Sequence, residues 1–254
     1  MTVKLMIDQV LTGKRVLIRE DLNVPIKDGK VSSDARIKAA LPTIKMALDA
    51  GASVIIMSHL GRPTEGQYDI GSSVKPVAAH LSKLLGQPVA VERNWTNGLE
   101  IAEGSLVMLE NVRFHKRETA GTESFAEQLA KHGDVYVNDA FGTAHRAHAS
   151  TTVIANFFPT DKMFGLLLEA EIKSVAKVLN SYEKPLTAIV GGAKVSSKIT
   201  IIERLLDKVD NLIVGGGMAY TFVKAMGGKV GNSLVEDDYI DMAKKIMSEA
   251  KAKG

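Results

Sequence analysis

Arginine side chains follow several apolar runs of this sequence, close to the point where each run ends. The run at 53–59, SVIIMSH, leads into Gly61, Arg62 and Pro63, so it ends in two potential cations, His59 and Arg62. Other runs are followed by further arginines, which are Arg36, Arg113 and Arg146. Guanidinium groups bind phosphate or carboxylate through two parallel hydrogen bonds. Gathered in one place, these residues would form an anion-binding pocket.

Alternating strands and helices would have to position these side chains. Short apolar runs predict strands, and segments of helical periodicity predict helices between them. The predicted strands span 15–20, 53–59, 105–112, 134–141, 186–192 and 211–217. The predicted helices span 34–50, 72–85, 123–132, 166–180, 197–208, 218–226 and 237–251. Strands that are apolar almost throughout are typical of parallel sheets covered on both faces. The predicted fold class is therefore α/β, with open parallel sheets and helices on both faces.

The arginines are expected beyond the carboxyl ends of the strands of such a sheet. In open α/β sheets, ligands bind outside the carboxyl ends of the strands. Four successive predicted strands place an arginine at or near that edge, which favours a shared pocket. For any single arginine the alternative is a solvated loop residue paired with a local carboxylate. Asp21, after the first strand, could bond a substrate hydroxyl, hold an arginine, or simply form a turn before Pro25.

A change from an irregular to a helical sequence pattern near residue 170 predicts two domains. The longest helical pattern, 166–180, follows a less regular stretch. We expect one domain at 1–169 and a second at 170–254, with the helix as connector. The second domain offers only two strong strands, which make a poor independent sheet. Either it is unusually small, or the sequence is a piece of a longer protein.

The second half carries glycine turns and lysines after its strands. Gly191 and Gly192 precede Lys194 and Lys198, an arrangement in which backbone and ammonium groups could meet phosphate. A plain tight turn is the alternative. The turn at 215–217 could make room for a flat ring, or could serve packing alone. Neither turn has the P-loop or the G-x-G-x-x-G pattern.

Composition excludes several kinds of protein. Lys and Arg number 32 against 29 Asp and Glu, a net charge of +3, and no basic run points to nucleic acid. The absence of cysteine excludes disulfides, thiolate metal sites and a cysteine nucleophile. His145 and His148 alone are weak evidence for a metal site. No secretion signal and no membrane-spanning run is visible, so we expect a soluble cytoplasmic protein.

Six motifs together resemble one known family over essentially the whole chain. They are Asp21-Leu22-Asn23-Val24-Pro25, His59-Leu60-Gly61-Arg62-Pro63, Glu110-Asn111-Val112-Arg113-Phe114, the run from Asp139 to His148, Gly191-Gly192-Ala193-Lys194-Val195 and Gly215-Gly216-Gly217-Met218. In order and spacing they resemble the phosphoglycerate kinase family in its bacterial form. The resemblance implies two Rossmann-like domains joined by a helix, and reversible phosphoryl transfer between ATP and 3-phosphoglycerate that gives ADP and 1,3-bisphosphoglycerate.

The resemblance also implies roles for individual residues. The implied glycerate site consists of Asp21, Asn23, Arg36, His59, Leu60, Gly61, Arg62, Arg113 and Arg146. The implied nucleotide site consists of Gly191, Gly192, Lys194, Lys198, Gly215 and Gly216. Arg36, Lys194 and Lys198 are the implied catalytic residues.

The family also implies a cofactor and an assembly state. It uses Mg²⁺ with ATP or ADP, and its magnesium aspartate belongs to a phosphate loop that does not occur up to Gly254. We therefore expect no metal ligand in this chain, which would be a monomeric fragment that binds substrate without turning it over alone.

Three other functions compete with this interpretation. A non-catalytic anion-binding or regulatory module is the first, because a truncated enzyme would still bind. A nicotinamide-dependent oxidoreductase is disfavoured, because no dinucleotide fingerprint occurs and no acidic residue is placed for a ribose. A nucleic-acid or membrane partner finds no support in the composition.

Overall fold

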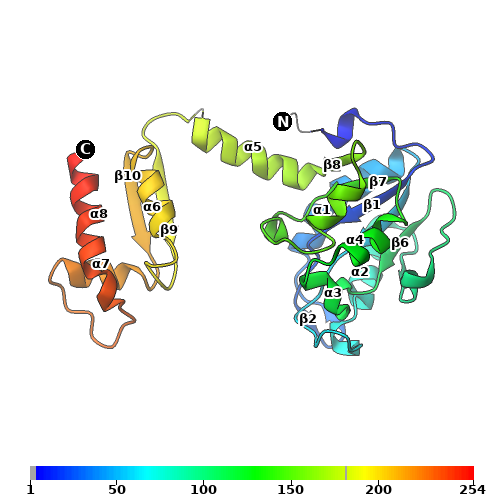
Figure 1. Ribbon diagram of the computed structural model, residues 1–254, viewed down its shortest axis with the longest axis horizontal. Coiled ribbons are helices and arrows are strands. Elements are labelled where there is room, and N and C mark those ends of the chain that lie inside the picture. The colour runs from blue at the N-terminus through cyan, green and yellow to red at the C-terminus, as the bar shows by residue number, and fades with distance from the viewer. Residues whose placement is uncertain (1–3, 181) are drawn as a thin grey trace. The chain divides into compact units, whose positions relative to one another are not determined.

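The computed structural model describes residues 4–180 and 182–254. The chain divides into two compact units, Met1–Lys173 and Ser174–Gly254, each with its own core (Figure 1). The division falls within helix α5 (Leu166–Asn180), after residue 173, where the sequence placed it after residue 169.

The first unit is built on a six-stranded parallel sheet in the order β5-β6-β4-β1-β7-β8. Strand β1 lies between β4 and β7, with Val16 aligned to Val54 and to Val135. The strands are β1 (Arg15–Arg19), β4 (Ser53–Met57), β5 (Ala90–Glu92), β6 (Leu106–Leu109), β7 (Val135–Asn138) and β8 (Lys162–Phe164). The four strands predicted for this unit are confirmed, whereas the short edge strands β5 and β8 were not predicted. A separate hairpin pairs β2 (Ile26–Lys27) with β3 (Lys30–Val31).

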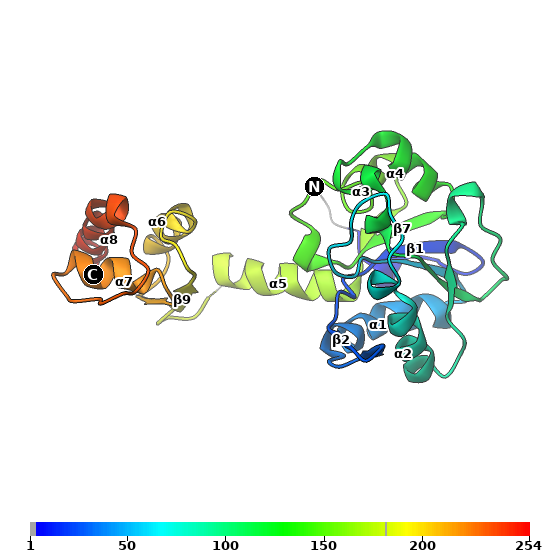
Figure 2. The ribbon, with the colours of Figure 1, turned by 90° about the horizontal axis from the view of Figure 1, so that it is seen from below.

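Helices cover both faces of this sheet, as the apolar strands predicted. Figure 2 shows α1 (Ala35–Asp49) and α2 (Lys75–Leu85) on one side, and α3 (Lys116–Thr119) and α4 (Glu123–Ala130) on the other. Alternate residues of β1 pack in two hydrophobic cores, one on each face of the sheet. Val16 and Ile18 pack in the core that contains α1 and α2, and Leu17 packs in the core that contains α4.

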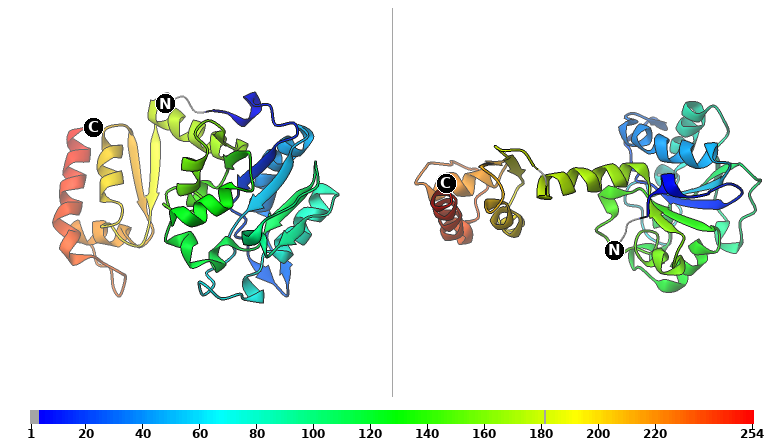
Figure 3. Two further views of the ribbon diagram at one scale, coloured as in Figure 1. Left: turned by 45° about the vertical axis from the view of Figure 1, so that its right-hand side comes forward. Right: turned by 90° about the horizontal axis from the view of Figure 1, so that it is seen from above.

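The second unit contains a two-stranded parallel sheet with helices on one side. It consists of β9 (Thr187–Gly191), α6 (Ile199–Leu206), β10 (Asn211–Gly215), α7 (Ala219–Ala225) and α8 (Ile240–Ala252). The left view of Figure 3 shows α6 and α8 beside the strands. Ile202, Phe222 and Ile246 form part of its core. On the strands' other face, Ile189 and Ile213 are 75% and 50% exposed.

Short 3-10 helices complete the connections of both units. They span Met6–Asp8, Ile70–Ser72, Trp95–Asn97, Val112–Phe114, Phe141–Thr143, Val153–Phe157 and Asp237–Tyr239. Across the two described ranges, no helix combines the length and the apolar character that crossing a bilayer requires.

The first turn of α5 is held by side chains from two other elements. The backbone N–H of Leu168 donates to Asp139 Oδ1 at 2.8 Å, and that of Leu166 donates to Thr43 Oγ1 at 3.0 Å. The Thr43 hydroxyl in turn donates to Asp139 Oδ2 at 2.5 Å. These bonds satisfy amides that the start of a helix leaves unpaired. The start of α5 is therefore fixed to the carboxyl end of β7.

Candidate functional site

The loops beyond the carboxyl ends of the strands meet around one cavity of about 310 Å³. Its lining consists of Asp21, Asn23, Arg36, His59, Gly61, Arg62, Arg113, Gly142, Thr143 and Arg146. The structure thus brings together eight of the nine residues expected to form the first-unit site, including all four arginines. Gly142 and Thr143 were not predicted to belong to it, although they lie within the motif that runs from Asp139 to His148.

A second cavity, of about 400 Å³, adjoins the first and shares three of its arginines. It is lined by Arg62, Pro63, Glu65, Arg113, Thr119, Arg146 and His148. The guanidinium groups of Arg62, Arg113 and Arg146 therefore border both cavities.

Hydrogen bonds hold the turn at Gly61 in place. Its backbone N–H donates to Asn23 Oδ1 at 2.8 Å, and its carbonyl accepts from Arg113 Nη1 at 3.0 Å. Gly61 has φ 63°, a left-handed conformation that glycine adopts without strain. The preceding Leu60 is buried and does not line the cavity, and its carbonyl accepts from Asn111 Nδ2 at 2.7 Å. Leu60 thus contributes packing to the site, and its neighbours contribute the polar groups.

Asp21 pairs with one of the cations. Its Oδ1 accepts from Arg36 Nη1 at 2.8 Å and from the backbone N–H of Asn23 at 3.3 Å, so of the roles considered for Asp21 the structure shows two, holding an arginine and forming a turn before Pro25. The side chain of Arg36 remains 53% exposed, at the start of α1. Arg36 is therefore oriented by Asp21 while still accessible to a ligand.

Positive charge is crowded in the cavity. Burial lowers the pKa of Arg113, and the nearby charges of Arg19, Arg146 and Arg62 lower it further. Two unit charges 4 Å apart repel by about 4 kcal/mol at an effective dielectric constant of about 20. A polyanion bound among these guanidinium groups would replace repulsion by attraction. The electrostatics of the cavity thus favour an anionic ligand.

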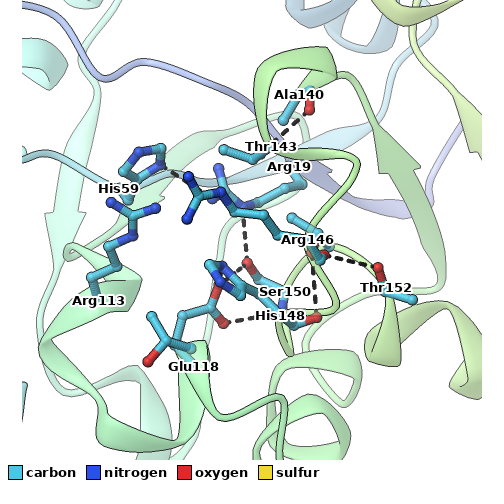
Figure 4. A network of polar contacts seen from close by, with 12 residues as sticks. Arg19, His59, Arg113, Glu118, Ala140, Thr143, Arg146, His148, Ser150 and Thr152 are labelled. Atoms are coloured by element: carbon cyan, nitrogen blue, oxygen red, sulfur yellow. Dashed lines mark hydrogen bonds and ion pairs between the residues drawn. The ribbon is translucent and has the colours of Figure 1, made fainter. Parts of the chain in front are cut away.

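A buried polar network adjoins the cavity through His59 (Figure 4). Arg19, on β1, is fully buried, and its Nε donates to Ser150 Oγ at 2.8 Å. Ser150 Oγ donates to Glu118 Oε1 at 2.6 Å. Arg19 Nη2 lies 3.3 Å from His59 Nδ1, and Arg19 Nη1 donates to the carbonyl of Glu20. Arg19, Glu118 and Ser150 were not predicted as site residues, because Arg19 lies within a strand and the predicted cations lie in the loops beyond the strands. An arginine inside an apolar run was the one available signal.

The surroundings of His59 favour its neutral form, so of the two potential cations at this turn Arg62 is the one that carries a positive charge. Burial lowers the pKa of His59, and the charges of Arg19, Arg113 and Arg36 lower it further, to about 2. Burial and the charges of Arg113 and Arg146 also lower the pKa of His148. The arginines alone therefore supply the positive charge of the lining.

In the second unit, two glycine turns pack together at one end of the sheet. Gly191 ends β9 and Gly215 ends β10. The carbonyl of Gly192 accepts from the backbone N–H of Met218 at 2.9 Å. At Gly216, where φ is 69°, a Cβ would lie 2.9 Å from that same carbonyl oxygen. Close approach of the turns therefore requires glycine at Gly216, which agrees with the packing alternative raised from the sequence.

Lys194 and Lys198 both lie beside the first of these turns. A Cβ on Gly192 would lie 3.5 Å from Lys198 Cε, so this side chain runs along the turn. Lys194 is exposed in the loop between β9 and α6. The six residues predicted for the second-unit site thus lie at the last positions of β9 and β10, in the turns that follow them, or at the start of α6.

The described residues offer no ready metal site. Within 4–180 and 182–254, no group of three or more His, Cys, Asp or Glu side chains is arranged to hold a metal ion. Magnesium prefers carboxylate and other oxygen ligands.

A larger cavity, of about 530 Å³, lies elsewhere in the first unit. Tyr136, Met163 and Phe164 are among its lining residues. Its two lysines are already engaged, because Lys4 Nζ donates to the carbonyl of Thr160 and Lys162 Nζ donates to that of Ala155. The candidate functional site is therefore the arginine-lined cavity, where cations converge.

Comparison with known proteins gives consistent matches. The family model described as phosphoglycerate kinase matches residues 6–254. The phosphoglycerate kinase of Francisella tularensis subsp. novicida (strain U112) is 51% identical over 247 residues, which are 97% of this chain and 63% of that protein. That of Francisella philomiragia subsp. philomiragia is also 51% identical over 247 residues, with the same coverage.

Solved structures give the same result. The structure of phosphoglycerate kinase from Coxiella burnetii is similar with a TM-score of 0.90 and 45% identity, covering 99% of this chain and 64% of that one. The enzyme from Pyrococcus horikoshii OT3 is similar with a TM-score of 0.83 and 31% identity, covering 98% of this chain and 66% of that one. This chain thus spans about 63% of the length of the curated relatives it matches.

Proposed function

The chain belongs to the phosphoglycerate kinase family, and on that premise we propose that it takes part in reversible phosphoryl transfer between ATP and 3-phosphoglycerate. A carboxylate oxygen of 3-phosphoglycerate would attack the γ-phosphorus of ATP while the bond from that phosphorus to ADP breaks, giving 1,3-bisphosphoglycerate. The supporting observation is that four arginines from separate parts of the chain line one cavity. Such a reaction needs positioned cations more than a covalent catalyst.

In this proposal the first unit binds the glycerate. Arg62, Arg113 and Arg146, which border both cavities, bind its phosphate or carboxylate. Asn23 holds the Gly61 turn, and Asp21 holds Arg36. Arg36 would be the residue of this unit that meets the transferred group. Each tenfold in rate corresponds to about 1.4 kcal/mol, so one well-placed guanidinium group could contribute orders of magnitude.

The second unit would bind the nucleotide. The glycine turns after β9 and β10 would let its phosphates and ring approach the backbone, and Lys194 and Lys198 would neutralise its phosphates. Magnesium, when it accompanies ATP, neutralises charge on the phosphate oxygens. Among the described residues no group of three or more metal-ligating side chains occurs, and we assign no step to that ion. We further propose a monomer in the cytoplasm, without nucleic-acid or membrane partners.

For the 254-residue polypeptide by itself, we propose binding of 3-phosphoglycerate with negligible turnover. This is the anion-binding function considered above, and it is favoured by the match to only 63% of the relatives' length. The activity of the family would then require residues outside this match.

Isothermal titration calorimetry with 3-phosphoglycerate, with and without Mg-ATP, tests the proposal. We expect saturable heat from the purified 254-residue polypeptide, and none from an Arg62→Ala and Arg146→Ala double variant that remains folded. Lack of glycerate binding by the wild type would count against the assignment. A coupled kinase assay with normal turnover would contradict the proposal that this polypeptide is inactive alone.

A further inference from the structure

The two ring nitrogens of His59 have different surroundings. Nδ1 lies 3.3 Å from Nη2 of Arg19. Nε2 makes no hydrogen bond to any described residue, and His59 lines the 310 Å³ cavity. Figure 4 shows the arginine against one side of the ring. One nitrogen is therefore engaged by the protein, and the other remains for a ligand.

The chemistry of the guanidinium group decides the direction of this hydrogen bond. A guanidinium has five N–H donors and no acceptor, and it stays charged in proteins. Nδ1 of His59 must therefore accept, and the proton of a neutral ring must lie on Nε2.

The guanidinium is itself held by several partners. It donates to Ser150 Oγ and to the carbonyl of Glu20, and the Ser150 hydroxyl in turn donates a hydrogen bond to Glu118. Arg19 is fully buried, so bulk solvent does not reach these bonds. The direction of every bond in the chain from Glu118 to His59 is thereby fixed.

We propose that Arg19 is a positioning residue, which holds His59 as the neutral tautomer with its proton on Nε2. His59 then presents a hydrogen-bond donor to the cavity and adds no charge. A carboxylate or phosphate oxygen is the partner that such a donor selects. The identity of that ligand rests on the proposed function, whereas the tautomer is a property of the protein without ligand.

The groups that face the ring oppose its protonation. Arg19, Arg36, Arg113 and His148 act on it directly, and Asp21, Arg62 and Arg146 line the same cavity. Asp21 is the one acid in that lining, and its carboxylate is bonded to Arg36. Lowering the pH over the physiological range should therefore leave the ring neutral.

Nitrogen-15 NMR of the histidine rings tests the tautomer in the 254-residue polypeptide without ligand. A His59→Asn variant assigns the signals, and the exposed His145 serves as a reference within the same sample. We expect the Nε2–H tautomer of His59, with no titration between about pH 5 and 8. An imidazolium, or a ring protonated on Nδ1, would overturn the proposal.

Two substitutions test the role of Arg19. Arg19→Lys keeps a charged donor and should preserve the Nε2–H tautomer. Arg19→Met removes the donor, so a folded variant should show a mixture of tautomers or a titrating ring. An unchanged ring in that variant would refute the role of Arg19. If Arg19→Met does not fold, Arg19→Gln takes its place. Its amide can donate or accept, so both tautomers are expected, and one unchanged tautomer would be the contrary result.

The same samples separate this proposal from the proposed function. Titration with 3-phosphoglycerate and with inorganic phosphate follows the NMR measurement. Failure of both ligands to bind a protein that has the Nε2–H tautomer would contradict the function and leave the tautomer intact. Tight binding by a protein whose His59 is protonated on Nδ1 would contradict the proposed tautomer and leave the proposed function intact.

Discussion

Individual side chains at the cavity are held in place before any ligand arrives. Arg113 is bonded to the carbonyl of Gly61, and Arg36 is bonded to Asp21. Long side chains lose conformational entropy when they are fixed, and each immobilised one costs about 0.5 to 1.5 kcal/mol on binding. Because these side chains are already fixed in the folded protein, part of this conformational entropy is lost during folding and not on binding. The arginines of this cavity should therefore bind more tightly than the same residues on a free surface.

Substitutions in the two units should separate the two ligands. Arg62→Ala is expected to weaken 3-phosphoglycerate binding about 10- to 150-fold, the loss of a charge-assisted hydrogen bond, with little effect on nucleotide. Lys198→Ala should do the reverse in a full-length family member that carries these residues. Calorimetry measures both affinities, with the exposed Arg204→Ala as control. Equal effects on both ligands would contradict the division of roles.

Glu20 should make stability depend on pH. It is fully buried, and neither carboxyl oxygen has a hydrogen-bond partner among the described residues. Burial first, and then the charge of Asp139, raises the pKa of Glu20 well above 4.5. The unfolded carboxyl ionises at lower pH than the folded one, so the contribution of this group to stability falls as pH rises through the folded pKa.

Glu20→Gln should therefore stabilise the protein at neutral pH by about 1 to 3 kcal/mol, because it removes the ionisation of a buried group without partners. Below about pH 4.5, the gain should vanish. Urea denaturation across this range measures the difference, with the exposed Glu100→Gln as matched control. A gain that did not change with pH would show that ionisation is not its cause.

Among the elements, α5 depends on a cap formed outside its own sequence. Asp139→Asn removes one carboxylate oxygen from a site where both accept hydrogen bonds. We expect a loss of about 0.5 to 2 kcal/mol in the free energy of unfolding. Hydrogen exchange at the amides of 166–168 should become faster. The exposed Asp8→Asn is the control, and unchanged exchange in Asp139→Asn would show that the cap does not limit opening of this turn.

Strands and helices were predictable where their pattern was long and apolar. Strand β1 was visible in the sequence, whereas β5 and β8 were not, because three residues carry too little periodicity. The arginines of the cavity were predictable because they follow strands. Arg19, Glu118 and Ser150 were not, since an arginine inside an apolar run is the one local signal and it does not reveal that residues so distant in sequence form one buried network.

At the scale of the whole molecule, the chain carries a natural reporter of one unit. Trp95 is its single tryptophan, and it is buried in the first unit. Its ring packs against those of His115, Phe125 and His132 at centroid distances of 5.1, 5.6 and 5.8 Å. Tryptophan fluorescence therefore follows the first unit, whereas circular dichroism follows both.

Ligand binding should stabilise the two units unequally. At 100 times its Kd, 3-phosphoglycerate should add about 2.7 kcal/mol to the first unit and raise its Tm by about 5 to 11 °C. The fluorescence transition should move by that amount, while part of the circular dichroism transition stays in place. Arg62→Ala should reduce the shift at equal ligand concentration. Identical shifts by both probes would indicate that the units unfold together.

The central position of β1 also affects how the protein is made. Val16 pairs with Val54 on one side and with Val135 on the other, and the second partner lies 119 residues later, since 135 minus 16 is 119. At about 5 to 20 residues per second, a ribosome needs roughly 6 to 24 s to supply it. During that delay, one edge of an apolar strand has no neighbour. Chaperones that bind such edges should hold the nascent chain until β7 has emerged, and release it afterwards.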